Sequence, residues 1–254
     1  MTAALAIRHV RRMSDAPHPV RKLYGRRKGP KLSAHQQHLL DHLLPQVAVN
    51  VQSAVDPRTY FSPPPRGEVG SRSEPGGGQV DDIWLEIGFG GGEHLFWQAQ
   101  HHPNVGLIGA EPYLNGVVKL LSKREASPLP NIRIHMGDAR EIIEAMPDAS
   151  LGRVFILFPD PWPKTRHHKR RFIQMEMLDQ LARVMKPGAE LRFASDDSGY
   201  LEWTLERLMA HPSFEWTAAR ASDWRSRPDG WPPTRYEAKE LHGKPVFLQF
   251  IREG

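Results

Sequence analysis

Asp160 lies in a segment whose residue types suggest chemistry rather than a plain structural turn. An apolar run ends at this aspartate, a proline stands on each side of it, and Trp162 follows: residues 154–171 read VFILFPDPWPKTRHHKRR. Prolines stiffen a loop and reduce the entropy that is lost when a reactive group is held in place. A carboxylate fixed in this way can stabilise developing positive charge or accept hydrogen bonds that orient a substrate.

A block of basic residues follows Asp160. It consists of Lys164, Arg166, His167, His168, Lys169, Arg170 and Arg171. Charge blocks often form only a solvated face, but this one adjoins a candidate reactive carboxylate, and enzymes that act on nucleic acids commonly hold the substrate through its phosphates. We therefore interpret the block as an RNA-contacting segment. Trp162 could stack on an exposed base or pack against the neighbouring prolines.

A glycine-rich turn occurs earlier in the chain, where residues 85–95 read LEIGFGGGEHL. Glycines at 88, 90, 91 and 92 permit a tight turn and let a ligand approach the backbone closely. A dinucleotide-binding turn would need glycine at position 93, where this chain has Glu93. An acid at the start of a helix also disfavours phosphate binding there. The turn predicts a nucleotide-like ligand and argues against an NAD-dependent oxidoreductase.

Acidic side chains accompany the ends of three successive predicted strands. Glu86 precedes the glycines, Glu111 ends the second strand, and Asp138 follows the third. Each of them could be a helix cap or a turn residue. Together they suit a ligand with a ribose, an amine and an adenine edge, because carboxylates accept hydrogen bonds from those groups. S-adenosylmethionine carries all three groups and no phosphate.

Short apolar runs that alternate with helical patterns extend from residue 81 onward. Runs without strict alternation, each followed by a helix, indicate a parallel sheet covered on both faces. We expect an α/β fold, doubly wound and Rossmann-like, with a mostly parallel seven-stranded sheet whose ligands bind at the carboxyl ends of the strands. The predicted strands are 83–88, 105–111, 132–138, 154–160, 190–196, a weak 214–216, and 246–251.

The sequence before this domain is basic. Residues 1–31 hold nine Lys/Arg against one acid, Asp15, whereas the remainder carries 25 basic and 28 acidic residues. Such an arm suits a polyanion, because each neutralised phosphate releases counterions. A solvated tail and a mitochondrial presequence are the alternatives. No run approaches the ~18 apolar residues of a membrane helix, so we expect a cytoplasmic protein.

We expect three segments: a basic arm and helix over 1–55, a Pro/Gly-rich linker over 56–80, and the α/β domain over 81–254. Residues 33–47 predict a helix that Ser33 caps and Pro45 ends or bends. His35, His38 and His42 share a spacing that a metal site could use, although a polar helix face explains it equally well, and no metal is expected.

The motifs LEIGFGGGEHL, GAEP, GDA, FPDPWPKTRHHKRR, RFASDD and PPTRYEAKE, in this order, resemble those of the bacterial tRNA (guanine-N7-)-methyltransferases. The likeness covers nearly everything from 81 to 251. It implies that the chain methylates guanosine 46 of the tRNA variable loop with S-adenosylmethionine, and that it needs no accessory subunit. Oligomeric state and the range of accepted tRNAs do not follow from it.

The resemblance also assigns roles to residues. It makes Asp160 catalytic and places Glu86, Gly88, Gly90, Glu111, Asp138 and Asp160 at the cofactor, and Lys164, Asp196, Thr234, Arg235, Tyr236 and Glu237 at the substrate. Thr234 to Glu237 also fits a helix capping box. The alternatives are a methyltransferase that acts on another RNA atom, and a non-catalytic RNA-binding protein on the same fold. The absence of cysteine excludes methylation through a thiol adduct.

Overall fold

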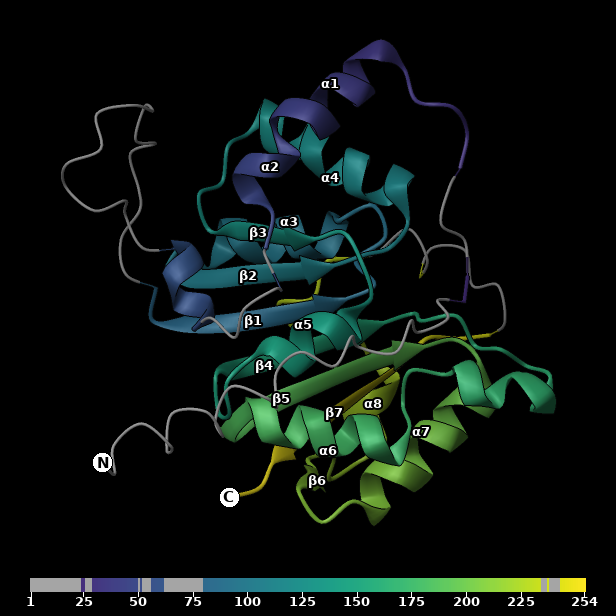
Figure 1. Ribbon diagram of the computed structural model, residues 1–254. Coiled ribbons are helices and arrows are strands. Elements are labelled where there is room, and N and C mark those ends of the chain that lie inside the picture. The colour runs from purple at the N-terminus through teal and green to yellow at the C-terminus, as the bar shows by residue number, and fades with distance from the viewer. Residues whose placement is uncertain are drawn as a thin grey trace, which may run out of the picture.

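The computed structural model describes residues 24–25, 29–49, 51, 56–61, 80–233, 237 and 243–254. Within these residues the chain forms a seven-stranded sheet in the order β3-β2-β1-β4-β5-β7-β6, from the top of Figure 1 downward. Its strands are β1 Asp82–Ile87, β2 Val105–Ala110, β3 Ile132–His135, β4 Leu151–Leu157, β5 Met185–Ser195, β6 Phe214–Trp216 and β7 Val246–Arg252.

The sheet is mostly parallel, as the sequence predicts. Strands β1 to β5 pair in parallel, while β7 runs antiparallel between β5 and β6. Because parallel neighbours need a crossover, a helix separates most consecutive strands. The chain order reverses at β1, which lies between β2 and β4, and such a reversal opens a crevice at the carboxyl ends of the strands.

Helices cover both faces of the sheet, and each face has its own apolar core. Leu95 and Leu120 pack on one face, and Ile142, Leu178 and Leu208 pack on the other. Figure 1 shows these two layers of helices on opposite sides of the strands. The helices are α1 Ala34–His42, α2 Leu44–Val47, α3 Glu93–His101, α4 Leu114–Ala126, α5 Ala139–Ala145, α6 Met175–Val184, α7 Ser198–Ala210 and α8 Ser222–Arg225, with 3-10 helices η2 Pro57–Phe61 and η3 Thr165–Arg170.

The predicted helix over 33–47 is present but broken, at the place where the sequence predicts a bend. Ser33 caps α1 through a full capping box with Gln36, and the helix ends at His42. Pro45 then lies in the first turn of α2, where its missing N–H removes no hydrogen bond. The histidine side chains have other partners: His38 and His42 stack on each other, and His35 bonds Glu125 on α4.

The start of the predicted linker packs into the domain. Phe61, the last residue of η2, is buried in the core, and the Arg133 guanidinium lies 4.9 Å from its ring centre. The ring passes so close to β2 that a β-carbon on Gly106 would lie 2.6 Å from it. Apolar burial at Phe61 therefore ties this segment to the sheet, although its prolines and glycines predict a loop. Residues 62–79 lie outside the described part of the chain.

Candidate active site

Predicted site residues meet at one edge of the sheet because β1, β2, β3 and β4 are parallel and end together. Gly88 follows β1, Glu111 follows β2, Asp138 lies three residues after β3, and Asp160 lies three residues after β4. These positions surround the crevice where the strand order reverses. The fold thus brings together four segments that are far apart in the sequence.

The glycine-rich turn uses the backbone freedom that its sequence implies. Gly88, Gly90 and Gly92 all have positive φ angles, at 73°, 56° and 72°. Most other residues would be strained there. The Gly90 N–H donates a hydrogen bond to Glu111 Oε2 across 2.7 Å, so the turn is held against the end of β2. The glycine-rich turn and Glu111 therefore form one structural unit.

Glu111 is buried, yet backbone groups satisfy its carboxylate. Its second oxygen accepts a hydrogen bond from the Tyr113 N–H at 2.8 Å, and the residue is only 7% exposed. Burial raises the pKa of Glu111, and the two N–H donors oppose that rise while the nearby charges of Asp160 and Glu86 add to it. Each carboxylate oxygen keeps a further lone pair, which a ribose hydroxyl can use.

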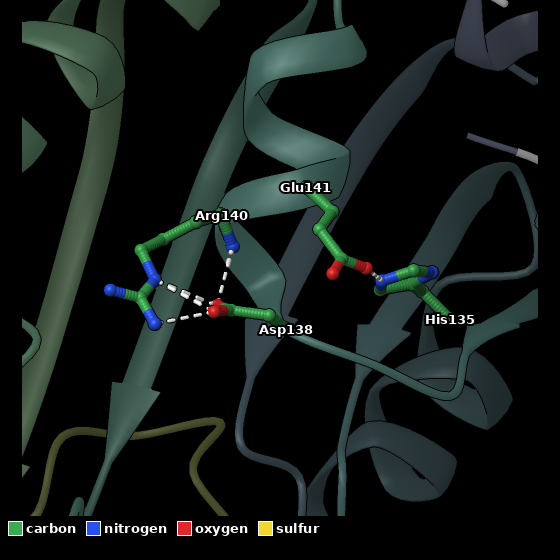
Figure 2. A network of polar contacts seen from close by, with 4 residues as sticks. All are labelled: His135, Asp138, Arg140 and Glu141. Atoms are coloured by element: carbon green, nitrogen blue, oxygen red, sulfur yellow. Dashed lines mark hydrogen bonds and ion pairs between the residues drawn. The ribbon is translucent and has the colours of Figure 1, made fainter. Parts of the chain in front are cut away.

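Asp138 has two local roles, which Figure 2 shows. It caps α5 by accepting a hydrogen bond from the Arg140 N–H at 3.0 Å. The same carboxylate accepts hydrogen bonds from the Arg140 guanidinium, with Nε 2.8 Å from Oδ2. Beside this pair, His135 contacts Glu141 at 3.0 Å. An adenine amino group that bonds Asp138 would share the carboxylate with Arg140, which sequence reasoning missed although it lies only two residues away.

Glu86 lies beneath the glycine turn and is 3% exposed. Its carboxylate accepts a hydrogen bond from His94 Nδ1 at 2.8 Å, while His94 Nε2 lies 3.0 Å from the Gln98 side-chain nitrogen. Gln98 also donates to the carbonyl of Gly230 at 2.9 Å. A neutral His94 that donates from Nδ1 and accepts at Nε2 satisfies this chain of contacts. The sequence offered no signal for it beyond a histidine in the first turn of a helix.

A cavity of about 570 Å³ opens at this edge of the sheet. Its size lies within the usual range for small-molecule sites. Gly88 and Asp138 line it, together with the side chain of Arg140. The other wall comes from the segment after β4, which contributes Lys169 and Arg170. Of the predicted cofactor residues, Gly88 and Asp138 line the cavity, whereas Glu86, Gly90, Glu111 and Asp160 do not. Its size and this lining fit a nucleoside cofactor without phosphates, as S-adenosylmethionine is.

Asp160 lies on an exposed loop with an unusual backbone. Phe158 and Trp162, two residues before and after it, adopt positive φ angles of 51° and 45°. Residues other than glycine rarely adopt this backbone conformation, and it is found most often in functional loops. Trp162 packs edge-on against the ring of Tyr24, and the Arg170 guanidinium lies over both rings, 4.5 Å from Tyr24 and 4.9 Å from Trp162. The end of the basic arm therefore contacts the predicted catalytic loop.

The basic block divides by exposure. Residues Thr165–Arg170 form η3, where Arg166 and Lys169 are exposed and His167, His168 and Arg170 are partly buried. Arg171 is different: it is 4% exposed, and its guanidinium donates to the carbonyls of Pro161 at 2.8 Å and Gly199 at 3.0 Å. The structure thus presents the predicted RNA-contacting residues at the surface, with the exception of Arg171.

Two of the remaining predicted substrate residues follow strands at the same edge. Lys164 is exposed beside η3, and Asp196 follows β5 directly, in the same half of the sheet. Thr234, Arg235 and Tyr236 lie outside the described residues, while Glu237 contacts Arg227 at 3.5 Å.

Trp231, on the loop before Thr234, is an anchor rather than a surface residue. It is 6% exposed, and its ring lies 5.5 Å from that of Phe247. Its backbone neighbour Gly230 accepts the hydrogen bond from Gln98. This packing anchors the loop on β7.

Fold and site together define an S-adenosylmethionine-dependent methyltransferase. A family described as "Putative methyltransferase" matches residues 81–248. The 16S rRNA methyltransferase KamB has the same fold, with a TM-score of 0.51 at 19% identity over 69% of this chain and 90% of its own.

Two curated relatives are far more similar in sequence. The tRNA (guanine-N(7)-)-methyltransferase of Rhodospirillum rubrum is 47% identical over 94% of this chain and 91% of its own length. The protein of the same name from Caulobacter vibrioides is 47% identical over 93% of this chain and 97% of its own. The chain belongs to the tRNA (guanine-N(7)-)-methyltransferase family, as its motifs predict.

Proposed function

We propose that this chain transfers a methyl group from S-adenosylmethionine to N7 of guanosine 46 in the variable loop of tRNA, which gives 7-methylguanosine. One observation carries the proposal: the cavity at the strand ends is lined by Gly88 and Asp138 on one side and by Lys169 and Arg170 on the other. A nucleoside cofactor site and a phosphate-binding segment therefore share one cavity. The family's activity on tRNA agrees with this arrangement.

Three groups of this chain hold the cofactor. S-adenosylmethionine, when bound, supplies a methyl group on a positively charged sulfur. Glu111 accepts hydrogen bonds from the ribose hydroxyls, because its oxygens keep lone pairs beyond the two backbone N–H donors. Asp138 accepts a hydrogen bond from the adenine edge, and the glycine turn at 88–92 allows close approach to the backbone. Glu86 accepts a hydrogen bond from His94, which lies at the start of the helix that follows the turn.

Asp160 acts on the base. Guanine N7 has a lone pair and no proton, so it attacks the methyl carbon directly, the electron pair of the broken bond leaves with sulfur, and no residue removes a proton. Positive charge then develops on the imidazole side of guanine. The Asp160 carboxylate either stabilises this charge or accepts hydrogen bonds from the guanine amino and imide groups to orient N7. An Asp160→Asn variant separates the two roles, because it keeps an acceptor and loses the charge.

The tRNA backbone is held by the cations of η3. Arg166, Lys169 and Arg170 contact phosphates, with His167 and His168 beside them. Lys164, Asp196 and the segment from Thr234 to Glu237 contact the nucleotide that is methylated. The basic arm extends this surface, and the enzyme works in the cytoplasm without an accessory subunit. Among the described residues, no helix is long and apolar enough to cross a membrane.

The test is methyl transfer from labelled S-adenosylmethionine to unmodified bulk tRNA, followed by digestion to nucleosides and mass spectrometry. Label in 7-methylguanosine is the expected result. Label in another nucleoside would support S-adenosylmethionine as the methyl donor, but it would show that guanine N7 is not the target atom. No label, despite measurable tRNA binding, would favour a non-catalytic RNA-binding protein.

A further inference from the structure

Arg171 ends the basic block and lines the cavity beside Lys169 and Arg170, but unlike the other residues of the block it is buried. It is 4% exposed, less than any of the other cations in the block. A guanidinium that binds a polyanion must reach the solvent, whereas this one lies between the loop of Asp160 and the start of α7. Its position indicates a role inside the protein.

The contacts of Arg171 connect three elements. Nε donates to the carbonyl of Pro161, next to Asp160, at 2.8 Å, and Nη1 donates to the carbonyl of Gly199 in the first turn of α7 at 3.0 Å. The guanidinium carbon lies 4.9 Å from the ring centre of Tyr200 and 5.1 Å from that of Trp203. Two rings of α7 thus surround the cation while its donors fix the loop.

The residues that surround Arg171 are themselves fixed. The Tyr200 hydroxyl accepts hydrogen bonds from the backbone N–H groups of Phe172 and Ile173, at 2.9 and 3.3 Å. The Trp203 indole N–H donates to the Ile173 carbonyl at 2.7 Å. The segment that carries Arg171 is therefore attached to α7 at several points, and the loop of Asp160 is attached to that segment through the guanidinium.

The loop needs such an attachment because its backbone is strained. Trp162, which directly follows Pro161, has a φ angle of 45°, and Phe158 has one of 51°. Strained conformations persist only where the surroundings impose them. The conformation of Phe158 is held by a hydrogen bond that its N–H donates to the Ala194 carbonyl on β5 at 2.7 Å. On the other side of Asp160, the bond from Arg171 to the Pro161 carbonyl fixes the peptide that leads into Trp162.

The chemical cost of this arrangement also points to function. Among the described residues, no carboxylate lies within ion-pair distance of Arg171, so two carbonyls and two aromatic faces surround the buried charge, and the more distant charge of Asp197 also favours it. Burial of a charge without a close ionic partner is unfavourable. A neutral side chain could fill the space, but it could not hold the Pro161 carbonyl with a rigid, planar donor.

We propose that Arg171 is a positioning residue: it fixes the Pro161–Trp162 peptide and thereby the direction of the Asp160 carboxylate toward the base that is methylated. This inference rests on the proposed function, because it assigns Asp160 to the reaction. It differs from the interpretation of the whole block as an RNA-contacting segment, since it removes Arg171 from that set and gives it a role in turnover.

The test compares Arg171→Lys with Arg220→Lys, a control at an exposed cation on the loop before α8. Both substitutions keep the charge, so neither alters the long-range attraction of tRNA. Lysine at 171 loses the planar pair of donors. We expect a kcat at least tenfold lower for Arg171→Lys, with the Kd for tRNA and for S-adenosylmethionine within twofold of wild type and an unchanged salt dependence. Arg220→Lys should leave kcat near the wild-type value.

Two further measurements make the result specific. Methylguanidinium added to Arg171→Ala should recover part of kcat, and it should not recover that of Asp160→Ala. Amide hydrogen exchange in the peptide that spans 158–164 should be faster in Arg171→Lys than in wild type or Arg220→Lys, and this readout needs no substrate. An unchanged exchange rate, or a weaker tRNA affinity at unchanged kcat, would overturn the inference. A wild-type enzyme that methylates nothing would instead overturn the proposed function.

Discussion

A β-carbon placed on Gly25 would lie 3.1 Å from the Asp160 carboxylate, so the backbone at the end of the basic arm passes directly beside the predicted catalytic residue. Gly25 has a φ angle of 104°, which side chains rarely allow. Next to it, Tyr24 packs on Trp162. Tyr24 and Gly25 therefore lie against the loop of Asp160, although Gly25 and Asp160 are 135 positions apart in the sequence.

Asp160→Ala should lower kcat by at least ~10²-fold, because it removes the carboxylate that acts on guanine. The fold should stay intact, since Asp160 is exposed and contributes no packing in the core. Circular dichroism and S-adenosylmethionine binding check the fold, and a methyl-transfer assay checks turnover. Asp41→Ala, at an exposed position on α1, is the matched control and should retain activity. A folded Asp160→Ala protein with wild-type activity would exclude this role for the carboxylate.

Neutralisation of Arg166, Lys169 and Arg170 should weaken tRNA binding and flatten its dependence on salt. Each lost phosphate contact should reduce the slope of log K against log [salt] by about 0.7 to 0.9. Binding titrations at several salt concentrations measure the slope. Arg220, whose side chain is 82% exposed on the loop before α8, is the control position. A slope that does not change would mean that the η3 cations touch no phosphate.

The cofactor affinity should depend on pH through Glu111. Burial raises the pKa of this carboxyl above its ordinary value of 4.5, and ribose binding requires the ionised form. Affinity should therefore fall on acidification, beginning at a higher pH than an exposed glutamate would cause. Glu111→Gln should bind more weakly at neutral pH and lose this part of the pH dependence. Calorimetry between neutral and mildly acidic pH measures both effects.

The same group affects stability in the opposite direction. The folded protein holds the proton on Glu111 more tightly than the unfolded chain, so its contribution to the free energy of unfolding is present below pH 4.5 and is lost as pH rises through the raised pKa. The increase in Tm on adding S-adenosylmethionine should consequently grow with pH. An increase that is the same at every pH, in wild type and in Glu111→Gln, would contradict this account of the carboxylate.

Gly116→Ala should displace the glycine-rich turn at 88–92, which Gly116 contacts from α4. A β-carbon at Gly116 on α4 would lie 2.3 Å from the Gly90 carbonyl oxygen, so the turn or the helix must move. Overpacking of this kind costs ~1–3 kcal/mol of stability. We expect a lower Tm together with a higher Kd for S-adenosylmethionine. Gly188→Ala, at a φ angle of 79° with no atom within 4 Å, should lower Tm and leave this Kd unchanged. Equal Kd values in both variants would show that the turn tolerates the shift.

Much of the fold follows from local patterns in the sequence. The apolar runs predict all seven strands of the sheet, and the helix cap at Ser33 and the break near Pro45 follow from side-chain chemistry. The strand limits differ by a few residues: β4 begins at Leu151 and β5 at Met185, before their predicted starts. Pairing with a neighbouring strand extends both, and no pattern within one strand can indicate that.

The site could be predicted only in part, because its motifs name residues but not their neighbours. Glycines and acids at strand ends identify Gly88, Glu111 and Asp138. Nothing in the sequence shows that His94 bonds Glu86, since that contact depends on how α3 lies against β1. Likewise, the residue types of the seven basic residues after Trp162 do not tell which of them is buried, and only packing against α7 reveals that it is Arg171. Tertiary contacts decide these roles.

The most direct test of methyl transfer to guanine N7 uses two ligated tRNA transcripts that differ in one atom. One has guanosine at position 46, and the other has 7-deazaguanosine, in which a C–H replaces N7. Both are incubated with labelled S-adenosylmethionine and the full chain, and the position of the label is mapped. We predict stoichiometric label at position 46 of the first transcript and none at that position of the second. Equal label at position 46 in both transcripts would contradict the account.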